Sequence, residues 1–119
     1  MKRRYRLRRQ AEFQSVIAGK RVYSGKALVA FAVPNSGDQN HVGVTVSKAV
    51  KSSVERNRAR RRLRELARVK LLGPDSPLTG LGIRYDVVLI ARPAALAVSF
   101  ADLSEEAAQA AIRLSKLNQ

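Results

Sequence analysis

Helical spacing of apolar residues predicts three helices. Phe13, Val16 and Ile17 lie three or four residues apart ahead of Gly19, so residues 10–18 are predicted to form a short first helix. Residues 52–72 begin at a serine pair and stop at Gly73-Pro74, which predicts a long second helix. Residues 99–117 are predicted to form a third helix, because they begin with a capping-box-like pair, a serine followed three residues later by an aspartate.

Four other segments have the pattern of strands. Residues 21–24 and the β-rich run at residues 26–35 are predicted as the first two. In residues 41–47, Val42, Val44 and Val46 alternate with smaller or polar residues and share one face. Residues 85–93 contain a continuous apolar run, which is typical of a central strand covered on both faces. The order of elements predicts an α+β fold, a two-layer sandwich of helices on a sheet.

The predicted helix at 52–72 separates an apolar stripe from a cationic face. On a wheel of about 100° per residue, Ala59, Leu63, Leu66 and Ala67 lie on one side. The opposite side carries polar and charged residues: Asn57, Arg58, Arg61, Arg64, Glu65 and Arg68. Arg56 and Arg60 lie near the edges of the stripe. The sequence therefore predicts a core helix with an outward cationic face.

The total charge makes nucleic acid the first partner to consider. The 119 residues, enough for one domain, include 23 Lys and Arg against 9 Asp and Glu, a formal net charge of +14. Fifteen of those cations lie in two runs, residues 2–9 and 51–70. Such clustering favours a phosphate-binding surface, although any single arginine is equally compatible with a solvated face. An anionic membrane is not predicted, because neither cationic run has a broad apolar face.

The absence of cysteine fits a reducing compartment and excludes disulfides, thiolate nucleophiles and cysteine-bound metals. The first residues, MKRRYRLRR, precede no apolar run long enough for a signal sequence or a membrane span. An arginine-rich transit peptide is the alternative, but the pattern from Phe13 onward is that of folded sequence. We expect a cytoplasmic protein with a single domain over residues 1–119 and a basic arm at residues 1–9.

Nothing in the sequence predicts a catalytic site in the polypeptide. The only histidine, His41, opens a strand after a turn, where a surface or strand-edge role is the simpler interpretation. No serine has a nucleophile-elbow pattern, and no glycine-rich segment has the lysine of a phosphate loop. The grouped acids Asp102, Glu105 and Glu106 open the last helix, where they compensate its dipole. We therefore expect no catalytic residue, no metal site and no small-molecule substrate.

Residues 42–68, VGVTVSKAVKSSVERNRARRRLRELAR, resemble the signature of the bacterial ribonuclease P protein subunit. In that family a strand ending in VSK leads into a helix with an R-N-R-x-(K/R)-R-x-x-R-E pattern, matched here from Arg56-Asn57-Arg58 through Arg61 to Arg64-Glu65. LRRQAEFQSVIAGKRV, YDVVLIARPAA and SFADLSEEAAQAA are also similar, so the resemblance spans nearly the whole chain.

The resemblance implies a protein that assists a catalytic RNA in cutting the 5′ leader from precursor tRNA. Ribonuclease P RNA and the leader would be its partners, and the RNA would hold the Mg²⁺ ions. The family fold, α-β-β-β-α-β-α, is similar to a domain of certain ribosomal proteins and places the basic helix in a left-handed crossover. General rules would instead favour a right-handed one.

The resemblance also implies two sets of site residues. The matching motif and the rest of the basic helix would contact the catalytic RNA: Lys48, Arg56, Asn57, Arg58, Arg60, Arg61, Arg62, Arg64 and Arg68. Guanidinium forks suit phosphate, and Asn suits a base edge or a 2′-hydroxyl. A cleft between the first helix and the sheet would hold the leader, with Phe13, Ile17, Phe31, Val44, Arg8 and Arg9 as its residues. Plain core packing is the alternative for both phenylalanines.

Three positions depart from the family pattern. Ile17 lies where many members have a second aromatic residue, Ala49 where a second lysine usually follows VSK, and Lys51 where glycine is common.

The sequence is also compatible with other classes of protein. A ribosomal or general structured-RNA-binding protein of the same fold would bind RNA without a role in cleavage. A DNA-binding protein would need a reading helix and a dimer, for which no zipper heptads are present, and an enzyme with its own active site is the last alternative.

Overall fold

The computed structural model describes residues 2–117. Its helices and strands are, in order, α1 (Gln10–Ile17), β1 (Lys20–Ser24), β2 (Leu28–Asn35), β3 (His41–Val46), α2 (Ser53–Leu66), β4 (Arg84–Ala91) and α3 (Phe100–Ser115). Short helical turns lie before α1, after α2 and before α3: η1 (Arg3–Tyr5), η2 (Ala67–Leu71) and η3 (Pro93–Leu96). The predicted order of helices and strands is confirmed. The domain and arm predicted from the sequence also include residues 1, 118 and 119, which lie outside the described residues.

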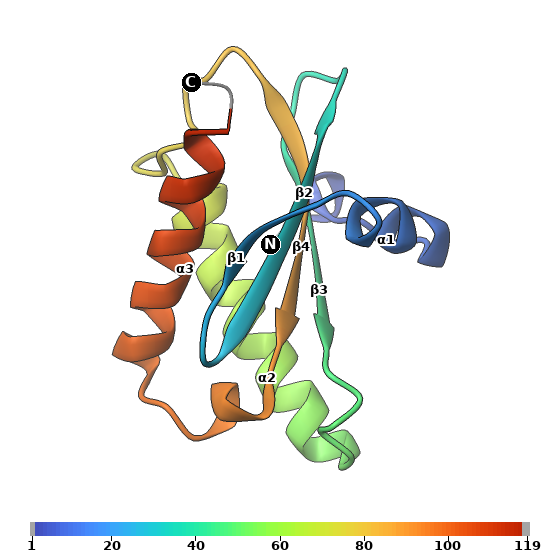
Figure 1. Cartoon of the computed structure of the whole chain (residues 1–119), viewed down its shortest axis with the longest axis vertical. Helices are drawn as coiled ribbons and strands as arrows, with labels where there is room; N and C mark the ends of the chain where they lie inside the picture. The colour runs from blue at the N-terminus through green and yellow to red at the C-terminus, as the bar shows by residue number, and fades with distance from the viewer. Residues whose placement is uncertain (1, 118–119) are drawn as a thin grey trace.

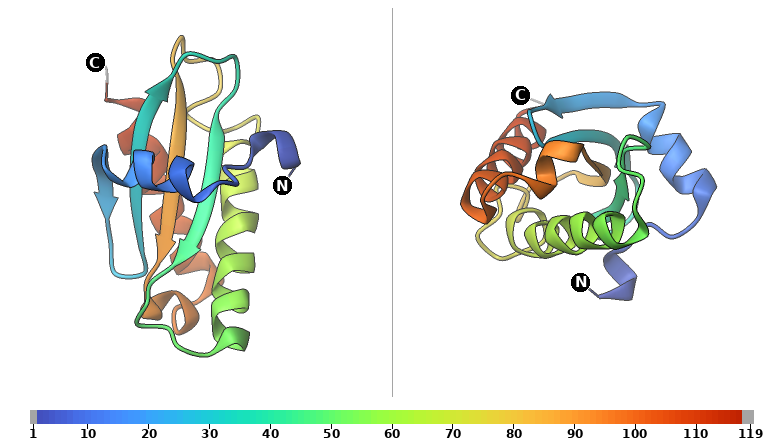
Figure 2. Two further views of the ribbon diagram at one scale, coloured as in Figure 1. Left: turned by 90° about the vertical axis from the view of Figure 1, so that its right-hand side faces the viewer. Right: turned by 90° about the horizontal axis from the view of Figure 1, so that it is seen from below.

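The four strands form one sheet in the order β1-β2-β4-β3. β2 is antiparallel to β1 and β4, whereas β3 is parallel to β4. In Figure 2 (left) β3 and β4 both run downward and β4 lies to the left of β3. The helix that connects them, α2, lies behind the sheet at its right-hand side. This path is left-handed, as the family resemblance implied and against the general rule. The prediction that β4 is a central strand is also confirmed.

Helices cover the sheet on both faces (Figure 1), with α1 on one side and α2 and α3 on the other, so the predicted layer of helices on a sheet is joined by a short helix on the second face. Alternate residues of each strand therefore enter different cores. The larger core, under α2 and α3, contains Val42, Val44 and Val46 of β3 together with Leu63 of α2 and Leu103 of α3. The smaller core, under α1, is built from Leu7, Val16 and Val88, with Phe13, Phe31, Val33 and Ile90 packed against it.

The apolar stripe of α2 is buried as its spacing predicted. Ala59, Leu63 and Leu66 are almost fully buried, and the hydroxyl of Ser52 caps the helix by accepting from the Glu55 backbone N–H at 3.4 Å. The predicted helix end at residue 72 is only partly right. The α-helix ends at Leu66 and continues as the π-helical turn η2, whose i→i+5 bond joins the Leu72 N–H to the carbonyl of Ala67 at 3.0 Å.

The basic arm is not a free tail over its described residues. The Leu7 N–H donates to the carbonyl of Val42 at 3.2 Å, a parallel bridge links Arg6 with Val42, and Leu7 is buried. These contacts cover the outer edge of β3, which would otherwise expose unpaired backbone groups. They also fix the arm's arginines beside α2 and α1.

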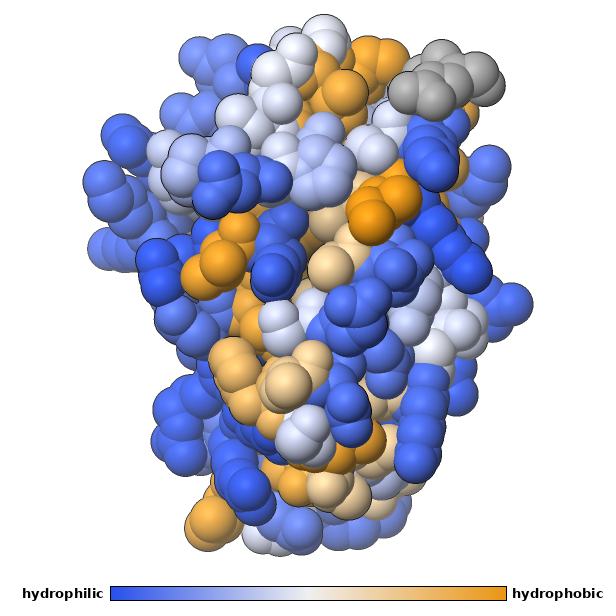
Figure 3. All heavy atoms as spheres, turned by 90° about the vertical axis from the view of Figure 1, so that its left-hand side faces the viewer, coloured by the Kyte–Doolittle hydropathy of each residue, from blue (hydrophilic) through white to orange (hydrophobic). Residues whose placement is uncertain are grey.

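The face of the molecule that carries α3 is mostly polar (Figure 3). Figure 3 shows the side of the molecule that carries α3, where apolar patches are separated by hydrophilic side chains. Among residues 2–117, no helix combines the length and apolar character needed to cross a membrane.

Candidate nucleic-acid interface

The outward face of α2 presents arginines with no protein partner. Arg58 and Arg61 are exposed, and within the described residues neither side chain makes a hydrogen bond or an ion pair. Lys48, in the connection between β3 and α2, is exposed in the same way. Because a surface guanidinium without a carboxylate keeps all its donors available, this face can accept phosphate oxygens directly.

Arg64 lies at the centre of a group of like charges. It is half-buried where α2 passes the arm, and burial followed by the nearby charges of Arg6 and Arg60 lowers the pKa of its guanidinium. Arginine nevertheless stays protonated at neutral pH. The Nε of Arg6 is buried without a hydrogen-bond partner in the described chain. Like charges gathered without an acid are unfavourable in the free protein, so this group is suited to an anion supplied from outside.

Two of the predicted phosphate ligands are used by the fold instead. The guanidinium of Arg56 donates to the carbonyls of Ser47 and Val50, both at 2.9 Å, and of Val46 at 3.2 Å. The guanidinium of Arg62 donates to the carbonyl of Ala95 in η3 and to that of Val98. We therefore replace the predicted phosphate contact of Arg56 and Arg62 with a structural role.

The remaining α2 residues have partial partners. Asn57 accepts from Arg60 through its side-chain oxygen at 2.8 Å, which leaves its amide N–H₂ free in the described structure. Beyond the end of α2, Arg68 donates to Glu65 at 2.6 Å and 3.2 Å, and this bond holds the pKa of Glu65 below its usual value. Both side chains of that pair are exposed, so water and salt screen the interaction.

A second candidate surface lies between α1 and the sheet. Phe13 of α1 packs over Gly43 of β3, where an added Cβ would lie 2.6 Å from two atoms of the ring. Phe31, Val88 and Gly43 form one row across β2, β4 and β3, and all face α1. Phe13 and Phe31 are both half-buried, so each ring is partly packed in the core and partly accessible. Both the packing and the stacking interpretations of these rings are therefore compatible with their burial.

One predicted cleft residue is wrong. Val44 lies in the larger core under α2 and α3 and is only 7% exposed. Neighbouring residues of a strand face opposite sides of the sheet. Because Gly43, the residue before it, faces α1, Val44 points away from α1. Thr45, half-buried and in register with Ile90, occupies the α1 face at the next position. Ile17 is 36% exposed at the end of α1 and remains compatible with the cleft.

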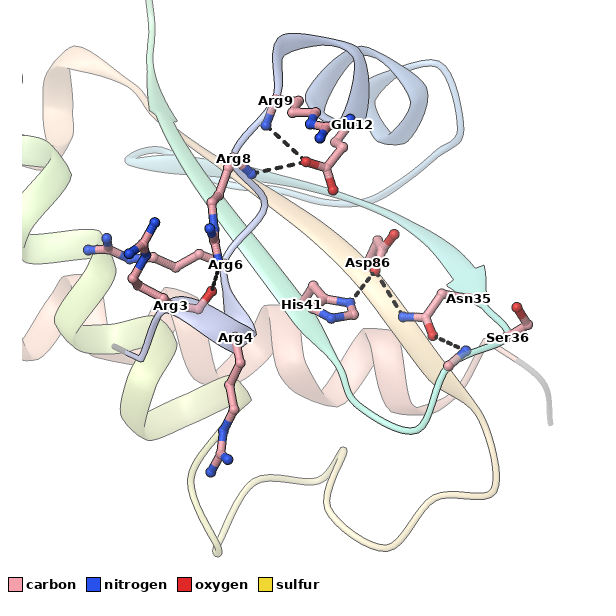
Figure 4. Close-up of a pocket in the computed structure, with 11 residues that line it drawn as sticks. Arg3, Arg4, Arg6, Arg8, Arg9, Glu12, Asn35, Ser36, His41 and Asp86 are labelled. Atoms are coloured by element: carbon pink, nitrogen blue, oxygen red, sulfur yellow. Dashed lines mark hydrogen bonds and ion pairs between the residues drawn. The ribbon is translucent and has the colours of Figure 1, made fainter.

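A third feature is a polar hollow beside the arm. Three side chains from the sheet line one side: the His41 Nδ1 and the Asn35 Nδ2 both lie 2.9 Å from the same oxygen of Asp86. Arginines of the arm line the other side, including the predicted cleft residues Arg8 and Arg9 (Figure 4). His41 opens β3 as predicted. Sequence reasoning identified the arm's charge, but it did not bring these residues together.

A family model described as Ribonuclease P matches residues 1–115 of the chain. The chain belongs to the ribonuclease P protein family. It is 43% identical over 103 residues to the ribonuclease P protein component of Dehalococcoides mccartyi strain 195, covering 87% of this chain and 78% of that one. It is 34% identical over 100 residues to the component from Clostridium kluyveri, covering 84% and 85%.

Solved ribonuclease P proteins share the fold. The Staphylococcus aureus protein has a TM-score of 0.70 at 22% identity, with 97% of this chain and 98% of that chain covered. The Thermotoga maritima protein has a TM-score of 0.72 at 22% identity, covering 91% and 96%. Family membership makes this chain a component of a ribonucleoprotein endoribonuclease that includes an RNA. It supports that assignment over the ribosomal or general RNA-binding alternative.

The described side chains of this ribonuclease P protein do not fit a metal site. Within residues 2–117, no group of three or more His, Cys, Asp or Glu side chains is placed to hold a metal ion. Asp86 and His41 pair with each other, and Glu12 accepts from the backbone N–H groups of Arg8 and Arg9 at 3.3 Å and 2.9 Å. These acidic side chains are thus engaged within the protein itself.

Proposed function

We propose that this protein assists a catalytic RNA in removing the 5′ leader from precursor tRNA. The polypeptide binds RNA in the cytoplasm, and the RNA performs the cleavage and holds the Mg²⁺ ions. The observation that carries the proposal is the outward face of α2, where Arg58 and Arg61 have no partner among residues 2–117 while the opposite face is buried. Such a face binds a phosphate backbone without disturbing the core.

The α2 face acts by supplying fixed positive charge. Arg58, Arg61 and Arg64 form the centre of the contact with the catalytic RNA, and Lys48 extends it toward β3. Guanidinium groups pair bidentately with phosphate oxygens, and the free amide of Asn57 can read a base edge or a 2′-hydroxyl. Cations held between two RNA surfaces reduce their mutual repulsion, so the substrate is bound at a lower concentration of Mg²⁺.

The cleft beside α1 is proposed to hold the single-stranded leader. The partly accessible rings of Phe13 and Phe31 offer stacking surfaces, each worth about 1–3 kcal/mol for an unpaired base. Thr45 replaces Val44 in the proposed lining because it lies on the correct face of β3. Ile17 contributes apolar contact in place of a second aromatic ring on α1.

The first test is cleavage of precursor tRNA at low Mg²⁺ with ribonuclease P RNA, with and without the protein. We expect the protein to lower the Mg²⁺ requirement, and the double variant Arg58→Ala/Arg61→Ala to lose most of this effect. The matched control Lys26→Ala/Lys116→Ala removes two exposed cations that do not belong to α2. An unchanged Mg²⁺ requirement on adding the wild-type protein would overturn the proposal.

The second test separates the leader from the rest of the substrate. Phe13→Ala is expected to weaken binding of leader-bearing tRNA by roughly 10-fold, from the loss of one stacking contact, and to leave binding of leaderless tRNA unchanged. Because Phe13 also packs in the smaller core, circular dichroism must show that the variant stays folded. Equal weakening for both substrates would refute the leader cleft.

A further inference from the structure

A pocket lies where the end of α2 meets the first turn of the arm. Six residues line it, two from the arm and four from the segment that follows α2: Lys2, Tyr5, Arg68, Leu72, Gly73 and Pro74. Figure 2 (left) shows the turn η1 beside the upper end of α2. The pocket has a volume of about 470 Å³, which is within the range of small-ligand sites. It shares no residue with the polar hollow beside the arm.

Aromatic and aliphatic side chains supply the walls of this pocket. The half-buried ring of Tyr5 comes from the arm, and Leu72 and Pro74 come from the segment after α2. The guanidinium of Arg4 lies 5.0 Å from the centre of the Tyr5 ring, but Arg4 does not line the pocket, so it holds the ring from outside. An exposed aromatic ring beside aliphatic groups is the kind of surface on which an unpaired nucleobase stacks.

Backbone bonds fix both walls before any ligand binds. The Tyr5 N–H donates to the carbonyl of Lys2 at 3.1 Å and closes the turn η1. The carbonyl of Gly73 accepts from the hydroxyl of Thr79 at 2.8 Å. Gly73 also packs tightly on the turn before it, since an added Cβ would lie 2.4 Å from the carbonyl oxygen of Val69. A ligand that enters a preformed pocket loses less binding energy to ordering the protein.

The charged groups of the pocket are hydrogen-bond donors. Lys2 and Arg68 can only donate. Arg68 uses its Nε and Nη2 on Glu65, and its Nη1 makes no hydrogen bond within residues 2–117. A base held here must therefore present acceptors. Guanine presents two side by side, N7 and O6, which is the edge that Arg and Lys recognise, whereas adenine and cytosine present an amino donor.

The pocket continues the RNA-binding face proposed for α2. Arg61, Arg64 and Arg68 lie three and four residues apart, so they share one side of the helix and of its extension. An RNA strand held by its phosphates along this side reaches the pocket at the end of α2. The cationic rim of the pocket, Lys2 and Arg68, matches the charge of such a strand.

We propose that this pocket binds an unpaired guanine of the catalytic RNA. The base stacks on Tyr5, and Lys2 and Arg68 donate to its N7 and O6. Glu65 acts as a positioning residue, because it holds the guanidinium of Arg68 through two hydrogen bonds. The inference rests on the proposed contact between α2 and the catalytic RNA, and it adds one specific base to a contact made mainly through phosphate.

The first test uses the wild-type protein and short single-stranded RNAs. Pentauridine is compared with pentamers whose central base is guanine, adenine, cytosine or 7-deazaguanine, and the ring resonances of Tyr5 are followed by NMR. We expect the guanine pentamer to bind on the order of tenfold more tightly than the adenine pentamer and to shift the Tyr5 signals. The 7-deazaguanine pentamer lacks the N7 acceptor and should lose most of this advantage. Equal affinities with unshifted Tyr5 signals would overturn the inference.

The second test measures binding of full-length ribonuclease P RNA. Tyr5→Leu should weaken it by roughly 10-fold, from the loss of one stacking contact, and should leave the salt slope unchanged because no cation is lost. Tyr5→Phe keeps the ring and should retain most of the affinity. The matched control is Phe100→Leu, which removes another partly exposed ring that lies near an arginine, Arg62, outside the pocket. Circular dichroism checks that each variant is folded.

The same assay separates this inference from the proposed role of α2. Arg58→Ala/Arg61→Ala should weaken binding of the catalytic RNA and reduce the salt slope by about 2, whatever the result for Tyr5→Leu. Wild-type affinity in a folded Tyr5→Leu protein would overturn the guanine pocket and leave the α2 face intact. A defect confined to binding of precursor tRNA by the assembled holoenzyme would also overturn it, because the base would then belong to the substrate.

Discussion

Arg56 and Arg61 lie five residues apart on α2, yet the structure predicts opposite consequences for their loss. Arg56 is bonded to three backbone carbonyls, one at the end of β3 and two in the connection from β3 to α2. Arg61 is exposed and makes no contact of this kind within the described residues. Arg56→Ala should therefore reduce stability, and Arg61→Ala should reduce only the affinity for RNA.

The size of the first effect depends on the three lost hydrogen bonds. A bond from a charged donor contributes about 1.5–3 kcal/mol, but water can reach part of this segment and replace some of what is lost. We expect Arg56→Ala to lower the free energy of unfolding by about 2–4 kcal/mol. For a chain of this length that lowers the Tm by roughly 8–16 °C. Arg61→Ala should stay within about 0.5 kcal/mol of the wild type.

Thermal melts followed by circular dichroism measure the stability of both variants in one buffer. Binding to ribonuclease P RNA is then measured over a range of salt concentrations. Loss of one phosphate contact in Arg61→Ala should reduce the slope of log affinity against log salt by about 1. Arg56→Lys keeps the charge but loses the planar fork, so it should recover only part of the lost stability.

The structural role of Arg56 is refuted if Arg56→Ala melts like the wild type and instead reduces the salt slope as Arg61→Ala does. That result would mean that the carbonyl bonds of Arg56 contribute nothing and that its guanidinium binds phosphate. Loss of stability in Arg61→Ala would equally contradict the exposed, unpaired position assigned to it.

Two further predictions concern acidic side chains. Glu106 on α3 accepts from the buried Ala27 N–H at 3.0 Å, so Glu106→Ala should destabilise the protein by about 2–4 kcal/mol in urea unfolding, whereas the exposed Glu105→Ala should change it by less than about 0.5. The hydrogen bond from the backbone N–H of Arg9 lowers the pKa of Glu12 below its usual value. The stabilising effect of this carboxylate is therefore present above the unfolded-state pKa and is lost as pH falls through the folded-state value. Urea midpoints against pH should therefore decline less steeply below about pH 4.5 in Glu12→Gln than in the wild type; parallel curves would contradict this assignment.

The sequence by itself determined the elements of this protein and the two sides of its basic helix. Ala59, Leu63 and Leu66 are buried where a helical period placed them, because that period depends only on local backbone geometry. The same holds for the shared face of Val42, Val44 and Val46, which results from the strand period of two. The motif around Arg56-Asn57-Arg58 indicated the family from the order of residues alone.

Only the tertiary structure decided which face of the sheet each strand side chain joins and which arginines are free. Strand alternation could not assign Val44 to α1 or to α2, because that choice depends on which helix covers which face. Arg62 is occupied by the carbonyls of Ala95 in η3 and of Val98 just after it, more than thirty residues further along the chain, and no local pattern encodes that approach. Arg6 likewise meets Arg64 and the hollow only because the arm lies along β3. Local spacing fixes the direction of a side chain on its own element, whereas its partners depend on long-range packing.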